Sequence, residues 1–222
     1  MKIRFRFGKL GKVRWTSHRD VARMWERGLR RAELPLAYTE GFSPRPQFSF
    51  GLALPTGCES TAEFIDVTLR EPIPLEGLSK LITPLLPDGI DVLGVGELAA
   101  GTDSLQQEVT SCRWEVEVPG VDQATLSVVL ARVLAADSLP VRRERKGREV
   151  DDDLRPSVLA LAAAVSKGDG TQLIAELATR PRGVRPTELA QVLGLDLGLT
   201  RRTNQWIECD GSRREPLAVD AG

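Results

Sequence analysis

The sequence predicts an α+β protein built from two ferredoxin-like (split βαβ) units in tandem. The first hundred residues read as β-α-β-β-α-β, a similar β-α-β-β-β-α order follows, and a polar stretch separates the two. The chain has 222 residues, enough for one large domain or two small ones that each bury a core. We therefore expect domains at 1–97 and 110–200, a linker at 98–109 and a charged tail at 201–222.

The first unit is predicted from alternation and capping signals. Residues 2–7 alternate between apolar and basic side chains, which predicts a half-buried strand with a basic outer face. Ser17 is expected to cap a helix, with Asp20 as the acid of a capping box. Strands at 48–54, 62–69 and 90–95 and a helix at 75–86 complete the unit. The buried stripe expected on the first helix is Val21, Trp25, Gly28, Leu29 and Ala32.

The second unit is predicted from shorter runs. Strands are expected at 112–118, 141–145, 158–165 and 172–178, and helices at 122–136 and 187–193. The alanine-rich segment 158–165 also has helical propensity. A glycine turn at 166–170 and another alternating run follow it directly, which favours a strand.

Composition places the protein among soluble globular chains, with 41% hydrophobic and 27% charged residues. No apolar run approaches the roughly 18 residues of a membrane span, and the start of the chain is too charged for a signal peptide. We expect a cytoplasmic protein without membrane contact. Three scattered cysteines, Cys58, Cys112 and Cys209, are typical of reduced thiols rather than a metal site.

Few residues are available for catalysis. His18 is the one histidine of the sequence, and a role in the helix cap is favoured over a catalytic one. Glycine-rich phosphate-binding motifs and clustered zinc or iron ligands are absent from the sequence, so no cofactor is expected. Asp151, Asp152 and Asp153 could hold a magnesium ion, although a solvated acidic corner is favoured. An independent enzyme is poorly supported.

Basic residues are concentrated at the start of the chain. Residues 1–50 carry 12 Lys and Arg against 4 Asp and Glu, whereas residues 51–137 carry 4 against 14. Such segregation on a chain of net charge −1 indicates a polyanionic or acidic partner. On the first helix four arginines spaced 4, 4 and 3 residues apart fall in one stripe. The alternative interpretation is a solvated helix face on which Glu26 and Glu33 reduce the repulsion between the arginines.

The segment EGFSPRPQFSFG, residues 40–51, joins that helix to the next strand. Residues that precede proline are extended, so Arg45 is presented between two prolines on a stiff arm. A guanidinium so placed suits phosphate contact or base stacking, and Phe42 could add a stacking face. Phe48 and Phe50 are assigned to the core. The candidate nucleic-acid-binding residues are Arg4, Arg6, Lys12, Arg14, Arg19, Arg23, Arg27, Arg30, Phe42 and Arg45.

Two segments carry a family resemblance. Residues 7–20 match F-x-K-x-G-x-x-R-[WF]-x-S-H-x-D, and residues 41–46 match G-F-[SN]-P-[RH]-P. In these motifs the chain resembles the bacterial radical SAM-linked (radical SAM-associated) protein family, whose function is unassigned. The resemblance implies a partner: a radical S-adenosylmethionine enzyme, often with a cobalamin-type domain. The chain lacks CxxxCxxC, so at most it is the accessory half.

The expected function is an accessory RNA-binding module that presents a structured RNA, a tRNA or rRNA, to that enzyme. A fold-level similarity to tandem ferredoxin-like RNA-processing proteins, such as Cas repeat endoribonucleases, points the same way. Two alternatives remain: a protein–protein adaptor without RNA contact, and a small metal-independent nuclease that uses His18.

Overall fold

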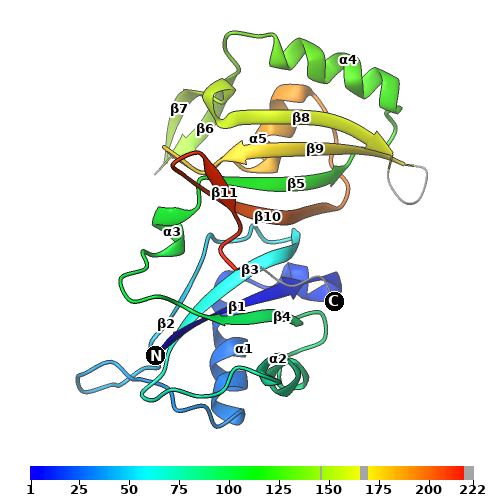
Figure 1. The fold of residues 1–222 in the computed structure, drawn as a ribbon. Coiled ribbons are helices and arrows are strands. Elements are labelled where there is room, and N and C mark those ends of the chain that lie inside the picture. The colour runs from blue at the N-terminus through cyan, green and yellow to red at the C-terminus, as the bar shows by residue number, and fades with distance from the viewer. Residues whose placement is uncertain (146, 166–169, 218–222) are drawn as a thin grey trace. The chain divides into compact units, whose positions relative to one another are not determined.

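A computed structural model describes residues 1–145, 147–165 and 170–217 (Figure 1). The fold is mixed α/β, and the chain divides into two compact units. One unit is Met1–Val109 together with the chain from Ile207 onward, and the other is Thr110–Trp206. Among the described residues, no helix is long and apolar enough to cross a membrane.

The first unit has the predicted β-α-β-β-α-β order. Its strands follow the order β4-β1-β3-β2, and all three neighbouring pairs are antiparallel. The elements are β1 (Lys2–Lys9), the 3-10 helix η1 (Gly11–Trp15), α1 (His18–Arg31), β2 (Phe48–Phe50), β3 (Glu59–Thr68), α2 (Leu78–Ile82), the 3-10 helix η2 (Thr83–Leu85), β4 (Val92–Glu97), α3 (Leu105–Glu108) and β11 (Ser212–Arg214).

Helices α1 and α2 contribute to one core with the apolar side of β1 (Figure 1). The ring of Trp25 lies 5.5 Å from that of Phe5 and 4.9 Å from that of Phe7, centroid to centroid. The predicted stripe of α1 is confirmed, since Val21, Trp25, Gly28 and Leu29 are buried, and Ala32 is the partly buried C-cap. The Ser17 cap is also confirmed, because its Oγ accepts a hydrogen bond from the Asp20 N–H.

The other side of β1 differs from its prediction as a basic outer face. Arg4 is 1% exposed, and its Nε and Nη2 donate to the two carboxylate oxygens of buried Asp66, at 2.6 and 3.0 Å. Its Nη1 donates to the Pro216 carbonyl at 3.2 Å and lies 3.6 Å from a Glu108 carboxylate oxygen. The alternation predicted the strand correctly, but distant segments of the chain cover its polar side.

Arg6 also contacts a distant segment of the chain on this side of β1. Its Nη1 lies 2.7 Å from Glu215 Oε2, and its Nε donates to the Thr61 carbonyl at 3.1 Å. The linker expected at 98–109 differs as well, because it contains α3 and the buried side chains of Leu105 and Val109.

The second unit has the strand order β10-β5-β9-β8, again with antiparallel neighbours. With the β6–β7 ribbon set aside, its elements follow the order β5-α4-β8-β9-α5-β10, which repeats the order and strand pairing of the first unit. The elements are β5 (Ser111–Glu117), α4 (Gln123–Leu134), β6 (Pro140–Arg145), β7 (Arg148–Asp153), the 3-10 helix η3 (Arg155–Ser157), β8 (Val158–Val165), β9 (Thr171–Ala178), α5 (Pro186–Leu193) and β10 (Thr200–Cys209).

Two predicted strands and the predicted tail, residues 201–222, have different outcomes in the structure. The alanine-rich segment is strand β8, as predicted, while most of the turn expected after it, 166–169, lies outside the described residues. Segment 141–145 is a strand, but it pairs with β7 in a separate ribbon. The segment expected to be a charged tail includes β10, which passes from the second unit into the first after Trp206. Residues 218–222 of that tail lie outside the described residues.

Candidate nucleic-acid interface

The solvent-facing side of α1 carries the predicted arginine stripe. Arg19, Arg23, Arg27 and Arg30 are all exposed. Arg23 lies 3.4 Å from the Asp20 carboxylate. Arg30 pairs with Glu26 at 2.9 Å, so the solvated-face interpretation is correct for part of the stripe. Arg19 and Arg27 have no ion-pair partner among the described residues, although the charge of Arg19 helps to lower the pKa of the Asp20 carboxyl.

The segment between α1 and β2 forms a closed loop (Figure 1). The Thr39 N–H donates to the Arg45 carbonyl at 2.9 Å, and the Arg45 N–H donates to Thr39 Oγ1 at 3.1 Å. A second backbone bond from Gln47 N–H to the Ala37 carbonyl, at 2.8 Å, closes the base. Arg45 and Phe42 are both exposed. The rigidity predicted from prolines therefore has a second source in these hydrogen bonds.

An aromatic side chain ties this loop to the helix. The guanidinium carbon of Arg30 lies over the ring of Tyr38, 5.6 Å from its centroid. Tyr38 itself is partly exposed at the base of the loop. This contact joins the C-terminal end of the arginine stripe to the base of the loop. We call the following set the α1–loop surface: Arg19, Arg23, Arg27, Arg30, Tyr38, Phe42 and Arg45.

The turn before α1 holds two further candidates and one residue that sequence reasoning missed. Lys12 is exposed, whereas Arg14 is half-buried and lies 3.4 Å from Glu59. The guanidinium carbon of Arg14 lies over the indole of Trp15, 5.3 Å from its centroid. Trp15 is 64% exposed. The sequence signal for it is an aromatic residue among the basic residues Lys12, Arg14 and Arg19.

His18 is not arranged for acid–base chemistry. It is the first residue of α1, is exposed, and packs edge-to-face on Phe50 with ring centroids 5.1 Å apart. The nearby Asp20 carboxylate instead accepts a hydrogen bond from the Ser17 hydroxyl at 2.7 Å, which lowers the pKa of Asp20. Among the described residues His18 has no carboxylate partner.

Arg4 and Arg6 do not join the α1–loop surface. Both point to the opposite side of β1 from Phe5 and Trp25, and their guanidinium groups are occupied by Asp66 and Glu215. The prediction that they contact nucleic acid is therefore not supported by their positions. Their guanidinium groups instead make contacts within the folded first unit.

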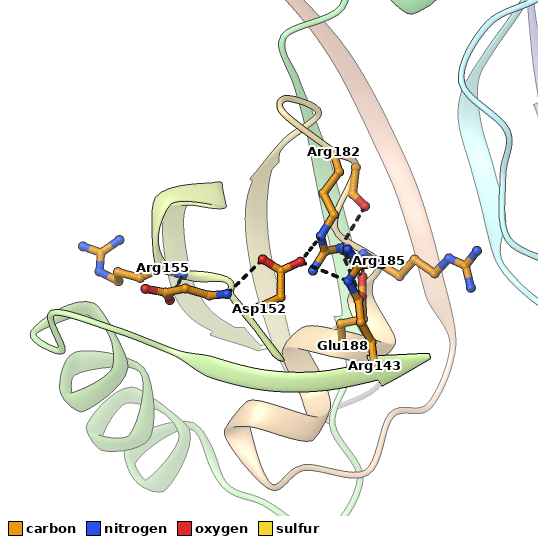
Figure 2. A network of polar contacts seen from close by, with 8 residues as sticks. Arg143, Asp152, Arg155, Arg182, Arg185 and Glu188 are labelled. Carbon is orange, nitrogen blue, oxygen red and sulfur yellow. Dashed lines mark hydrogen bonds and ion pairs between the residues drawn. The ribbon is translucent and has the colours of Figure 1, made fainter. Parts of the chain in front are cut away.

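The carboxylates of Asp151, Asp152 and Asp153 accept hydrogen bonds from arginines and from backbone N–H groups. Figure 2 shows the network around Asp152. Arg143 Nε and Arg182 Nε both donate to Asp152 Oδ2, at 3.0 and 2.7 Å, and these bonds lower the pKa of the Asp152 carboxyl. Arg182 also donates to both carboxylate oxygens of Glu188 at 3.0 Å. Asp152 thus connects the β6–β7 ribbon to the start of α5.

Asp153 and Arg155 hold the chain that follows β7, and Arg155 also contacts the end of helix α4. Asp153 accepts hydrogen bonds from the backbone N–H groups of Leu139 and Arg155, which lower its pKa. The Arg155 guanidinium donates to three carbonyl oxygens, those of Leu134, Ala136 and Val158. A basic side chain at a helix C-terminus satisfies free carbonyls and the helix dipole. Within the described residues, no group of three His, Cys, Asp or Glu side chains is placed to hold a metal ion.

The sequence model of the family described as "Uncharacterized protein conserved in bacteria (DUF2344)" matches residues 2–186. The chain belongs to this family. The DUF2344 match includes the whole α1–loop surface and most of the network of Figure 2, and it ends at the first residue of α5.

Other comparisons inform the fold alone. None of the curated proteins matches the DUF2344 chain. Among solved structures it is similar to a chain from the "Crystal Structure of a Cbf5-Nop10-Gar1 Complex", with a TM-score of 0.51 and 10% sequence identity. The similarity covers 91% of this chain and 48% of the other, so the DUF2344 chain spans about half the length of that relative.

Proposed function

We propose that this DUF2344 protein is a cytoplasmic accessory module that binds a structured RNA, a tRNA or rRNA, through its α1–loop surface. In this proposal the protein has two ferredoxin-like units and presents the RNA to a radical SAM enzyme. The observation that carries the RNA-binding role is a pair of exposed arginines on α1, Arg19 and Arg27, for which the described residues supply no ion pair, together with exposed Arg45 on the loop that follows the helix. The radical SAM partner rests on the sequence resemblance.

The electrostatic argument starts from repulsion within the helix. Like charges spaced three or four residues apart destabilise an isolated helix by a few tenths of a kcal/mol per pair. Asp20 and Glu26 form ion pairs with Arg23 and Arg30, whereas Arg19 and Arg27 form none with the residues that the structure describes. Phosphates would relieve this repulsion, and binding them releases counterions, which favours association at low salt.

The aromatic groups favour RNA over a purely acidic protein. Tyr38 is partly exposed beneath Arg30, and Phe42 is fully exposed on the loop that also carries Arg45. Unpaired RNA bases stack on aromatic rings and on guanidinium planes. The loop that carries Phe42 and Arg45 is already closed by backbone hydrogen bonds, so little conformational entropy is lost when it binds.

The test is a salt titration of affinity for tRNA and rRNA fragments. Replacement of Arg19, Arg27 and Arg45 by alanine should weaken binding and flatten the slope of log affinity against log salt by roughly two to three units. The control removes three exposed arginines outside this surface, Arg70, Arg132 and Arg180, with the same change in net charge. If both triple variants lose affinity equally, binding is nonspecific and the assignment of the surface is wrong.

The adaptor alternative gives a different result. In that case the wild-type protein does not bind RNA, whereas capture of the radical SAM enzyme depends on the same three arginines. Treatment with ribonuclease separates the two ideas further, because presentation of RNA predicts a complex whose yield falls when the RNA is digested.

A further inference from the structure

Trp15 is exposed to a degree that is unusual for tryptophan. The residue is 64% exposed, whereas Trp25 and Trp114 in the same chain are 0% and 4% exposed. Tryptophan is highly buried on average, so a ring left in solvent carries a hydrophobic cost that a ligand would remove. The residue ends η1 and stands just before the Ser17 cap of α1.

The backbone on both sides of Trp15 is held by buried groups. Lys9, 3% exposed, donates from Nζ to the carbonyls of Arg14 and Thr16, at 3.3 and 2.9 Å. The Gly57 N–H donates to the same Arg14 carbonyl at 2.9 Å. The turn is therefore fixed immediately before and immediately after the exposed indole.

The ring itself is also positioned. A Cβ at Gly57, where φ is +91°, would lie 2.9 Å from the indole, so the ring rests directly against that glycine. Arg14 lies over the ring, and its Nη1 is oriented by Glu59 Oε1, which also accepts a hydrogen bond from the Gly11 N–H. An aromatic group held this way loses little entropy on binding, as is typical of binding hot spots.

The surroundings decide which ligand fits. Arg14 lies against the ring, and Lys12, His18 and Arg19 are exposed nearby in sequence, so a cationic ligand is disfavoured. An apolar protein segment would need neighbouring apolar surface, which these polar residues do not provide. An anionic strand with flat aromatic bases matches both features.

We propose that Trp15 is a stacking platform for an unpaired nucleobase of the RNA. This inference rests on the proposed function, and it adds a requirement for a single-stranded or looped-out base. The base stacks on the part of the indole that Arg14 and Gly57 leave exposed, and the adjacent phosphates lie near Lys12 and Arg19.

The test compares Trp15→Ala and Trp15→Phe on three probes: an RNA hairpin with an unpaired loop, the same hairpin with abasic loop nucleotides, and a fully paired duplex. Loss of one stacked base should weaken hairpin binding by Trp15→Ala roughly 10- to 100-fold, while Trp15→Phe keeps most of the affinity. On the abasic hairpin and the duplex, wild type and Trp15→Ala should bind equally. The salt slope should be unchanged, because no phosphate contact is removed.

Failure of this inference is distinguishable from failure of the proposed function. If wild type binds the intact and the abasic hairpin equally and Trp15→Ala matches it, RNA binding stands and the platform is wrong. If wild type binds none of the probes, the proposed function is wrong, and the inference that Trp15 stacks on a base is wrong as well. Thermal melts of both variants serve as the folding control. If Trp15→Ala is unstable, the affinity of Trp15→Phe for the three probes is the second measurement.

Discussion

Arg4 and Arg27 show how the same side chain serves two purposes in one unit. Each nitrogen of the Arg4 guanidinium donates to a protein oxygen, in Asp66 or at Pro216. Arg27 is exposed and has no such partner among the described residues. The first arginine is part of the folded structure, and the second is available to a ligand.

Loss of the buried partner of Asp66 should be costly. In Arg4→Met the Asp66 carboxylate, 2% exposed, keeps Lys2 at 3.7 Å as its remaining cation. Breaking a buried pair in this way typically costs about 3–5 kcal/mol. We expect the free energy of unfolding, measured by urea titration, to fall by about that much. The double variant Arg4→Met with Asp66→Leu should recover most of the loss, and an unstable double variant would contradict the ion-pair explanation.

Arg45 should behave in the opposite way. Arg45→Ala is expected to weaken RNA binding by about 1–3 kcal/mol, the range for a hydrogen bond to a charged group, and to reduce the salt slope by about one. Thermal stability should barely change, because the side chain is exposed. Arg70→Ala is the matched control. A lower melting temperature with unchanged RNA affinity would identify Arg45 as a structural residue.

Sequence reasoning could not separate these two kinds of arginine. Alternation along residues 2–7 correctly predicted that Arg4 and Phe5 lie on opposite sides of a strand. It could not show that Pro216, more than two hundred residues later, covers the polar side. Arg45 was assigned correctly as exposed because its loop is defined by local prolines and glycines.

At the scale of elements, helix α1 was the most predictable part of the molecule. Its cap at Ser17 and its stripe from Val21 to Leu29 depend on residues within a few positions of one another. The β6–β7 ribbon was not predictable in the same way. Its alternation is that of any strand and does not specify that β6 pairs with β7 rather than with the sheet β10-β5-β9-β8.

The Asp152 network gives this ribbon a pH-dependent anchor. Hydrogen bonds from Arg143 and then Arg182 lower the pKa of the folded-state carboxyl below its unfolded value. Its contribution to stability is therefore fully present above the ordinary carboxyl pKa of about 4 and is lost as the pH falls through the lowered folded value. Asp152→Asn should melt at a lower temperature than wild type near pH 7, and the gap should close in acid.

The neighbouring aspartate provides the control for that experiment. Asp151 is well exposed and pairs with Arg142, itself exposed, so Asp151→Asn should change stability by less than about 1 kcal/mol. Melting curves for both variants from pH 7 to pH 3 make the comparison. If the Asp151 and Asp152 variants behave alike at every pH, the arginine pair around Asp152 does not stabilise the ribbon.

At the scale of the whole molecule, the two units differ in how the chain builds them. The second unit is one continuous segment, residues 110–206, whereas the first needs two segments, 1–109 and the chain from 207. We expect a fragment of residues 110–206 to unfold cooperatively on heating, with circular dichroism as the readout. A fragment of residues 1–109 lacks the partners of Arg4 and Arg6 at Pro216 and Glu215, and should be less stable than the same region in the full chain.

The return of the chain after Trp206 also sets an order of events on the ribosome. Strand β1 is translated before the second unit, but Glu215 and Pro216, which cover its polar side, are translated after the whole of that unit. Domains generally fold as units during synthesis, at about 5–20 residues per second. The second unit can therefore finish folding while the first is still incomplete. During that time Arg4 and Arg6 are accessible to solvent and to chaperones. The first unit is begun before the second and is completed after it.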